Sequence, residues 1–416
     1  MAAQLGPDAP LAVPTEPNVG NLGALRVCIA YDCLYPLTIG GAERWYRTLG
    51  ERLAGAGAQV IYLTRRQWTD EGPRIDGFRV VAVMPEADLY RTDGTRRLRP
   101  PLRFGWGVLW WLLRHRRDVD VVRVASFPFF SLLATRLALL GTGKPVEVDW
   151  FEVWPRRFWL EYAGGFSGRV GFLVQETCIR LTSHAFVFWH HTEARLRAHG
   201  FRGRLTVLAG LLPPVARPST GSISPAEPTV LFAGRMVKDK GVRLLPDALR
   251  IARSEHPSLR LIMVGEGPEQ ELLEERLREL GLREAVSFPG KVSDPELAEL
   301  FATATCVVVA SVREGYGLVV VEAAAAGTPS VVASNPENAA TGHVVEGLNG
   351  FVVEPTPEGL ARGIAAAIEG GDRLRRSTAD WYRDHADSQG MLRAADEVIA
   401  LHRLNGAPRQ DAARST

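Results

Sequence analysis

Cysteines are few in this chain, and none has the spacing of a metal site or of a redox pair. The 416 residues include only four, at Cys28, Cys33, Cys178 and Cys306. No Cys-x-x-Cys pair and no Cys/His cluster occurs among them. We therefore expect buried thiols in a cytoplasmic protein and no metal ion bound by cysteine.

The chain also lacks a strong charge imbalance and long apolar runs. Its net charge of +2 gives no support for a nucleic-acid partner. No uninterrupted apolar run reaches the roughly 18 residues that a membrane-spanning helix needs. Residues 1–23 lack the basic start and apolar core of a signal peptide, so they are predicted to be a disordered lead. We expect a cytoplasmic protein and leave open peripheral contact with the inner membrane face.

Two familiar nucleotide-binding signatures are missing as well. No Gly-x-Gly-x-x-Gly follows the first apolar run, and no Gly-x-x-x-x-Gly-Lys-Ser/Thr occurs. Their absence argues against a dinucleotide-dependent dehydrogenase and a phosphate-loop kinase. Asp118-Val-Asp120 resembles a metal-binding pair, but it directly precedes the apolar run 121–125. We interpret it as a turn at the start of a strand.

What the chain does contain is two series of short apolar runs that alternate with helix-like segments. The first series begins at residues 26–31, and the second begins at 229 after a stretch rich in proline, glycine and serine. Such alternation predicts an α/β fold with two doubly wound, Rossmann-like domains that face a cleft. The predicted parts are a disordered lead (1–23), an N-terminal domain (24–212), a linker (213–228), a C-terminal domain (229–382), a C-terminal helix that crosses back or stays with its own half (383–404) and a disordered tail (405–416).

The most informative segment is 311–328, where two carboxylates bracket a glycine-containing turn. Glu314 precedes the turn and Glu322 lies about two helical turns deeper. An apolar strand ends just before the turn and an alanine-rich helix follows it. Backbone N–H groups and the helix dipole at such a junction favour a phosphate. An ordinary helix start with solvated glutamates fits the same residues.

A second candidate site follows the first strand of the second series. Arg235 and Lys240 lie five residues apart in one loop. Two fixed cations match a diphosphate leaving group, which accumulates negative charge as its bond breaks. A basic, solvated loop is the alternative.

Together these motifs resemble the donor half of the retaining family-4 glycosyltransferases of GT-B fold, also described as glycosyl transferases group 1. The resemblance covers nearly all of residues 25–404. It is carried by Arg235 with Lys240-Gly241, the turn 265–268, the segment 311–329, Asn338-Ala-Ala, and 346–351.

The resemblance implies roles for individual residues, with a nucleoside diphosphate sugar as donor substrate and with neither a cofactor nor a metal. Arg235 and Lys240 would grip the diphosphate, and Glu314 would contact the sugar, as the catalytic residues. The implied donor-binding residues are Gly41 on the diphosphate, Val292 beside the base, Gly315, Tyr316, Gly317 and Leu318 through their backbone N–H groups, and Glu322 on the ribose.

The acceptor half departs from the family pattern. Phe151 stands where relatives usually carry a histidine, and Trp189 replaces a usual serine. Glu152 or Asp149 could take over, or the leaving phosphate could accept the acceptor's proton so that no side-chain base is needed. Impaired catalysis is the third possibility. His190 and His191, the nearest titratable residues, are interpreted as residues of a helix start.

Aromatic residues are concentrated in the first half, where seven of the ten tryptophans lie between residues 106 and 189. Such rings suit a sugar face or an apolar acceptor. We predict acceptor contacts from Trp150, Phe151, Glu152 and Trp154. Residues 96–117 have basic flanks around an apolar centre, which indicates either an interfacial helix near anionic lipid or a core helix with an exposed arginine edge.

These observations lead to one predicted function and two alternatives. We predict a retaining, metal-independent transfer of a hexose-like sugar from the donor to a hydroxyl of a glycan, a lipid-linked acceptor or a small apolar acceptor. The first alternative is a nucleotide-sugar-binding protein with lost or attenuated turnover. A GT-B nucleotide-sugar epimerase is the weaker one.

Overall fold

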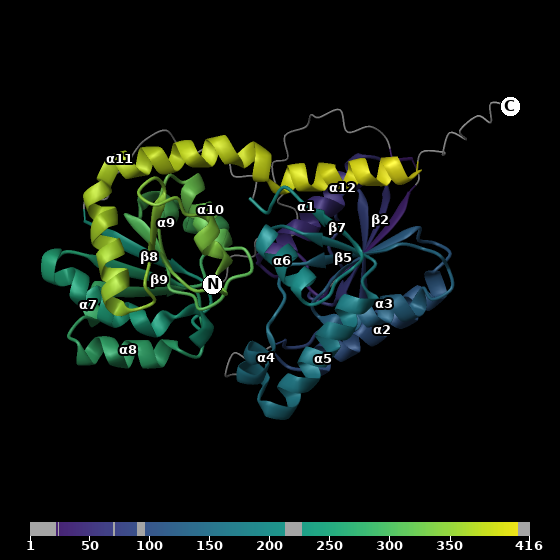
Figure 1. The fold of residues 1–416 in the computed structure, drawn as a ribbon, viewed down its shortest axis with the longest axis horizontal. Helices are drawn as coiled ribbons and strands as arrows, with labels where there is room; N and C mark the ends of the chain where they lie inside the picture. Colours follow the sequence, from purple (N-terminus) through teal and green to yellow (C-terminus); the bar gives the residue numbers. More distant parts are fainter. Residues whose placement is uncertain (1–21, 24, 70, 90–95, 213–226, 407–416) are drawn as a thin grey trace. The chain divides into compact units, whose positions relative to one another are not determined.

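A computed structural model of the chain describes residues 22–23, 25–69, 71–89, 96–212 and 227–406. These residues form two compact units (Figure 1). The first unit contains the described residues up to Leu89, Arg97–Leu211 and the chain from Gln389 on, and the second contains Leu212–Ser388. The predicted lead, linker and tail lie almost entirely outside the described residues.

The first unit is built on a parallel sheet of seven strands in the order β3-β2-β1-β4-β5-β6-β7. Strands such as β4 and β5 are buried along their whole length, as expected for a sheet that is covered on both faces. The order reverses between β1 and β4. The strands are β1 (Arg26–Ala30), β2 (Gln59–Arg65), β3 (Phe78–Met84), β4 (Val121–Ala125), β5 (Val146–Trp150), β6 (His184–Val187) and β7 (Arg204–Val207).

Two layers of helices cover this sheet. On one face, Phe104 of α2, Leu132 of α3 and Ile179 of α5 join one apolar core with alternate strand residues such as Val122 and Val148. On the other face, α1 packs against α12. The helices of the unit are α1 (Gly41–Gly55), α2 (Arg99–His115), α3 (Phe129–Ala138), α4 (Arg156–Ala163), α5 (Gly165–Leu181), α6 (His190–Ala198) and α12 (Met391–Gly406).

The second unit has a parallel sheet of six strands in the order β10-β9-β8-β11-β12-β13. Successive residues of β8 point to opposite faces: Val230 and Phe232 belong to one core cluster and Leu231 to another. The strands are β8 (Thr229–Ala233), β9 (Arg260–Val264), β10 (Val286–Gly290), β11 (Cys306–Val309), β12 (Ser330–Ala333) and β13 (Gly350–Val353).

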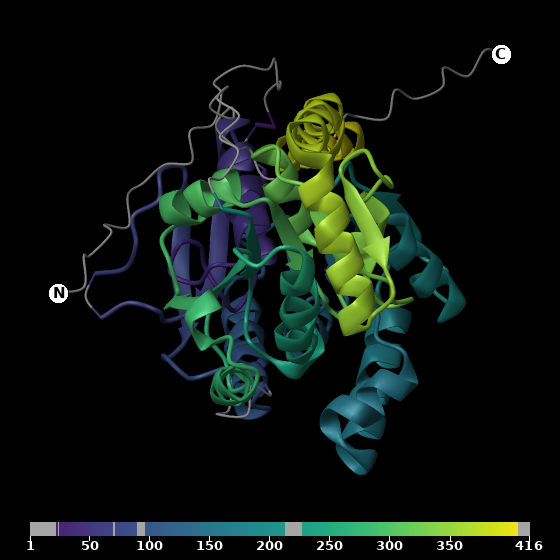
Figure 2. The same ribbon diagram turned by 90° about the vertical axis from the view of Figure 1, so that its left-hand side faces the viewer.

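Helices cover both faces of the second sheet too, so the predicted α/β fold of two doubly wound domains is confirmed. They are α7 (Leu245–Glu255), α8 (Gln270–Glu279), α9 (Asp294–Thr303), α10 (Leu318–Ala325) and α11 (Pro357–Gln389). The two segments of α11 meet at Gly371, whose φ of 46° is not helical (Figures 1 and 2). In the described part of the chain, no helix combines the length and the apolar character needed to cross a bilayer.

Candidate active site in the second unit

The loops after β8 and β11 meet where the strand order of the second sheet reverses. β8 and β11 are hydrogen-bonded neighbours, although more than 70 residues separate Val230 from its partner Cys306. In doubly wound sheets, ligands bind beyond the carboxyl ends of the strands at such a reversal. The loop after β8 carries Arg235 and Lys240, and the loop after β11 carries Glu314. Topology thus brings the predicted cations and the first predicted carboxylate to one edge.

An ion pair joins these two loops. Lys240 Nζ lies 2.6 Å from Glu314 Oε1, and the hydroxyl of Ser311 donates to the same oxygen at 2.7 Å. Both charged side chains are partly buried, with 28% of Lys240 and 15% of Glu314 exposed. A charge pair in this setting is screened less than one on the open surface. The Lys240–Glu314 pair places one cation and one hydrogen-bond acceptor side by side where the strand order reverses.

Two glycines allow the loops to approach this closely. Gly241 follows Lys240 with a φ of 65°, and a Cβ there would lie 1.9 Å from the carbonyl oxygen of Ala310. Gly317 has a φ of 88°, and a Cβ there would lie 2.5 Å from the Cβ of Ala340. Any other residue would add both backbone strain and a steric overlap. The glycines therefore fix the position of Lys240 and the start of α10.

The side chain of Asn338 holds the loop after β11 in place through hydrogen bonds. Its buried side-chain amide donates to the carbonyl oxygens of Ser311 and Ala333, at 3.1 and 3.0 Å. Its side-chain oxygen accepts from the backbone N–H of Ala340. The backbone of Glu314 is bound on both sides as well, since its N–H donates to Glu337 and its carbonyl accepts from Ala339. Glu314 is therefore fixed through its main chain and its side chain.

The remaining donor-side predictions lie around the same loops. Arg235 is exposed and lies just after β8. The backbone of the preceding residue, Gly234, packs closely against Gly265, which is possible because Gly265 has no Cβ. Tyr316 is buried, its ring lying 4.6 Å from that of His343. Gly315 lies between Glu314 and Tyr316, and Leu318 is the first residue of α10.

Glu322 and Val292 lie further from the ion pair in the chain. Glu322 is half-buried on α10. Burial, together with the charge of Glu322, raises the pKa of Tyr382 to about 12, so that this phenol keeps its proton. Val292 follows β10 and packs against the apolar cluster of Leu231.

Sequence reasoning missed His343 and the role of Ser311. His343 is 1% exposed, and burial lowers its pKa to about 4, so its ring is neutral at neutral pH. Nothing in the spacing of the sequence distinguishes this histidine. Ser311 belongs to the quoted motif, but only the structure brings its hydroxyl to Glu314.

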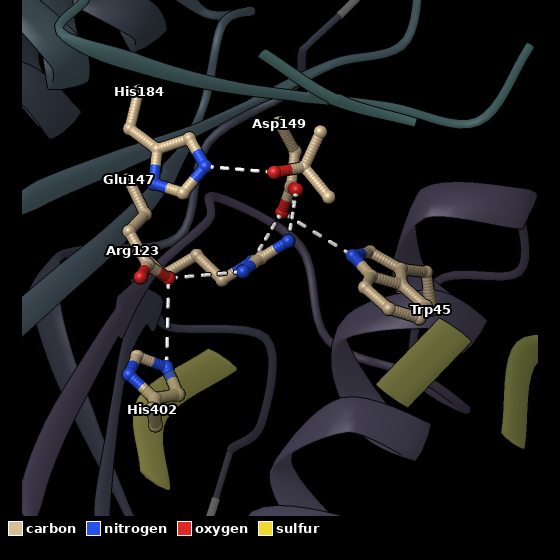
Figure 3. A network of polar contacts seen from close by, with 7 residues as sticks. Trp45, Arg123, Glu147, Asp149, His184 and His402 are labelled. Atoms are coloured by element: carbon tan, nitrogen blue, oxygen red, sulfur yellow. Dashed lines mark hydrogen bonds and ion pairs between the residues drawn. The ribbon is translucent and has the colours of Figure 1, made fainter. Parts of the chain in front are cut away.

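In the first unit, Asp149 cannot take over from the missing histidine. Its carboxylate lies in a buried network on the face of the sheet that α1 and α12 cover (Figure 3). Arg123 Nε donates to it at 2.9 Å, Trp45 Nε1 donates at 3.2 Å, and Arg123 also donates to Glu147. Although burial opposes it, the pKa of Arg123 is raised because the two carboxylates favour the charged form. The suggestion that Asp149 acts on a substrate is therefore wrong.

The predicted acceptor residues have different surroundings. Trp150 is fully buried and packs against Phe129, so the prediction that it contacts an acceptor is wrong for this conformation. Its place on a central strand turns its side chain into the core. Phe151 stacks on Phe188 with ring centroids 5.2 Å apart.

Glu152 and Trp154 lie just beyond the end of β5. Trp154 Nε1 donates to Glu152 at 2.7 Å, and its ring contacts those of Phe158 and Tyr162. Gly41 is the first residue of α1 rather than a loop residue, because the helix begins directly after Gly40. Its predicted approach to a diphosphate stays a prediction.

Comparison with known proteins agrees with this architecture. The profile of the family described as "Glycosyl transferases group 1" matches residues 220–381. A protein named glycogen synthase from Mycobacterium tuberculosis (strain H37Rv) is 38% identical over 393 residues, which is 88% of this chain and 87% of the relative. D-inositol 3-phosphate glycosyltransferase 1 from Catenulispora acidiphila is 38% identical over 189 residues, 42% of this chain and 43% of the relative.

Solved structures show the same fold. Sucrose-phosphate synthase from Thermosynechococcus elongatus superposes with a TM-score of 0.74 at 19% identity, over 92% of this chain and 99% of that one. HepE from Anabaena in complex with UDP-glucose has a TM-score of 0.68 at 18% identity, over 92% of this chain and 100% of that one. The chain therefore belongs to the glycosyl transferases group 1 family and is a glycosyltransferase of GT-B fold.

Proposed function

We propose that the chain transfers a hexose-like sugar from a nucleoside diphosphate sugar to an acceptor hydroxyl, with retained anomeric configuration and without a metal ion. The observation that carries the proposal is the Lys240–Glu314 pair at the reversal of strand order. The fold is shared with HepE, which was solved in complex with UDP-glucose. A nucleotide-sugar donor at this edge of the second unit is the simplest use of these residues.

The donor's leaving group accounts for the cations. As the bond between the anomeric carbon and the phosphate oxygen breaks, negative charge grows on the diphosphate. Lys240 and Arg235 stabilise that charge, and the backbone N–H groups of Gly315, Tyr316, Gly317 and Leu318 add to it at the start of α10. When the donor binds, the ammonium group of Lys240 would contact both Glu314 and the phosphate. The freed oxygen of Glu314 then accepts from a sugar hydroxyl.

The other donor contacts follow from the same arrangement. Glu322 lies further along α10 and binds the ribose hydroxyls, while Val292 provides an apolar contact for the base. The assignments of Glu322 and Val292 rest on the family resemblance and on their positions, Glu322 within α10 and Val292 just after β10.

Proton transfer in this proposal needs no side-chain base. Asp149 is held by Arg123 and Trp45, and Phe151 has no titratable group. In this proposal the acceptor's proton passes to the phosphate oxygen that leaves, while the acceptor oxygen bonds to the anomeric carbon on the same face. Because the bond forms on the face from which the leaving group departs, the anomeric configuration is retained.

Aromatic side chains beyond β5 favour an acceptor with a sugar face or an apolar group. Trp154, Phe158 and Tyr162 lie in mutual ring contact, and each is half-buried. With Glu152 beside them, they provide both a ring surface and a hydrogen-bond acceptor. A glycan, a lipid-linked acceptor or a small apolar acceptor fits this surface.

The proposal is tested with Lys240→Ala and a control two residues away. Lys238 lies in the same turn, but its side chain is exposed, so Lys238→Ala removes the same charge outside the ion pair. Removing a fixed donor to a developing charge typically costs about 10²–10³ in turnover. We expect a loss of that size for Lys240→Ala and less than about twofold for Lys238→Ala, measured as transfer or donor hydrolysis.

The donor is identified by thermal shift with UDP, GDP, ADP and TDP sugars, because a ligand stabilises only the fold that binds it. Absence of a shift with every nucleotide would contradict the proposed donor class. Turnover that EDTA abolishes would contradict metal independence, and NMR of the product tests retention. Donor binding without transfer or hydrolysis would instead indicate a binding protein with lost turnover, and Phe151→His should then raise the rate. An isomerised sugar formed without an acceptor would indicate an epimerase.

A further inference from the structure

Helix α2 presents a row of large apolar side chains to solvent. The row consists of Leu98 at the N-cap, Leu102, Trp106, Trp110 and Leu113, and we call it the α2 stripe. Its tryptophans are strongly exposed, with 61% of Trp106 and 41% of Trp110 accessible. The spacing of three or four residues places all five on one side of the helix. Single exposed apolar residues are common, but a continuous row with two tryptophans needs an explanation.

The α2 stripe is not the side by which the helix packs on its domain. Phe104, Val108 and Leu112 point the other way and are fully buried in the core under the sheet. This side of α2 packs against α3, which lies beside it in the first unit (Figure 1). The interpretation of residues 96–117 as a core helix therefore holds for one side of α2, and the exposed row on the other side needs a separate explanation.

The exposed tryptophans are already ordered with respect to each other. The rings of Trp106 and Trp110 meet edge to face with centroids 5.5 Å apart. The guanidinium of Arg114 lies 4.9 Å from the centre of the Trp110 ring and donates to the backbone carbonyl of the same residue. Tryptophan with arginine at one apolar edge is typical of side chains that sit at a membrane–water interface.

Charge accompanies the α2 stripe along its whole length. Residues 96–117 contain seven arginines and no aspartate or glutamate. Arg99 and Arg103 flank the beginning of the stripe, while Arg116 and Arg117 follow its end, and all four are exposed. An anionic surface is the complement of such a row, and it must also accept apolar side chains. A nucleic acid would meet the arginines but would leave the leucines in water.

We propose that the α2 stripe docks this enzyme on the surface of an anionic lipid bilayer. Trp106, Trp110 and Leu102 enter the boundary between headgroups and acyl chains, while the arginines stay among the anionic headgroups. The helix lies in the plane of the interface, and its buried side stays packed on the domain. This inference goes beyond the proposed transfer reaction, because it concerns a surface that none of the donor or acceptor assignments uses.

The test is sedimentation of the full chain with vesicles of phosphatidylcholine alone and of phosphatidylcholine mixed with phosphatidylglycerol. Binding is expected on the anionic vesicles and not on the neutral ones. Trp106→Ala/Trp110→Ala should lower the partition coefficient by about tenfold or more, since each loses buried apolar area at the interface. Leu272, an exposed leucine on α8 of the second unit, gives the matched control, and Leu272→Ala should leave partitioning unchanged.

The charge contribution is tested separately. Arg103→Gln/Arg116→Gln should lower partitioning into anionic vesicles by about tenfold. Arg373→Gln/Arg376→Gln changes the net charge equally at exposed positions of α11 and should have little effect. Donor binding by thermal shift should be unchanged in all these variants, which separates failure of this proposal from failure of the proposed function. Equal binding to neutral vesicles, or no vesicle binding with a tryptophan-dependent dimer in light scattering, would overturn the proposal.

Discussion

At the scale of single residues, Asn338 connects more of the candidate site than any charged group does. Its buried amide satisfies two carbonyl groups and one backbone N–H, in segments that include both Ser311 and Ala340. Leaving buried polar groups without partners costs about 1–3 kcal/mol each. Asn338→Ala should therefore lower the free energy of unfolding by about 2–4 kcal/mol, measured by urea denaturation.

Asn335 is the control for this prediction. It is half-buried, and its side-chain oxygen accepts a hydrogen bond from the N–H of Glu337. Asn335→Ala should cost about 1 kcal/mol or less. Donor affinity should fall for Asn338→Ala alone, because Asn338 holds the loop that carries Glu314. Equal destabilisation by the two variants would contradict the assigned role of Asn338.

The meeting of Lys240 and Glu314 could be predicted from the sequence, whereas the surroundings of Asp149 could not. Lys240 and Glu314 lie beside loop glycines after two strands, and the strand order of the fold then brings the loops together. Asp149 looked equally available in the sequence. Its ion pair with Arg123 depends on the pairing of β4 with β5, which places the two charged residues on the same face of the sheet. Nothing local in the sequence reveals such a pairing.

At the scale of elements, the turn between β11 and α10 depends on Gly317. Alanine there would adopt an unfavourable φ and would bring its Cβ to 2.5 Å from the Cβ of Ala340. We expect Gly317→Ala to lower the free energy of unfolding by about 2–4 kcal/mol, combining backbone strain with overpacking. Donor affinity should fall as well, since the start of α10 moves.

The variant Gly281→Ala separates backbone strain from overpacking. The φ of 68° at Gly281 is equally unfavourable for alanine, but no atom of the described residues lies within 4 Å of the added Cβ. Gly281→Ala should therefore show the strain alone, about 1–2 kcal/mol. The difference between the two variants in chemical denaturation measures the overlap with Ala340. A difference near zero would show that the turn can relax.

Strands were easier to predict than helices in this chain. Buried parallel strands appear as short apolar runs, and the runs 26–31 and 121–125 match β1 and β4 within a residue. Helix α2 spans Arg99–His115 and so extends beyond the apolar centre that marks it in the sequence, because arginine and proline at its ends hide its true length. Helices α4 and α5 were not predicted, since their aromatic and glycine residues follow no clear helical period.

At the scale of the whole molecule, the chain returns from the second unit to complete the first. Helix α12 follows α11 directly, yet it belongs to the first unit and packs on α1. Arg52 of α1 donates to Asp396, and His402 Nε2 lies 3.6 Å from Glu147 in the buried network of Arg123 (Figure 3). Burial lowers the pKa of His402, so its ring is neutral at neutral pH. From the sequence alone, this helix could pack on either unit, because its apolar period reveals a buried side but not the element against which that side packs.

Because α12 packs on the first unit, a destabilising substitution in α12 should lower the stability of that unit. Ile399 is fully buried and Leu404, five residues later on the same helix, is 75% exposed. A charge forced into a buried apolar position costs several kcal/mol, so Ile399→Asp should lower the stability of the first unit by about 3 kcal/mol or more. Leu404→Asp should change it by about 0.5 kcal/mol or less. In hydrogen exchange, the amides of α1 should lose protection in the Ile399 variant while those of β8 and β11 keep theirs. Loss of protection in β8 and β11 instead would mean that α12 stabilises the unit it follows in sequence rather than the one it packs on.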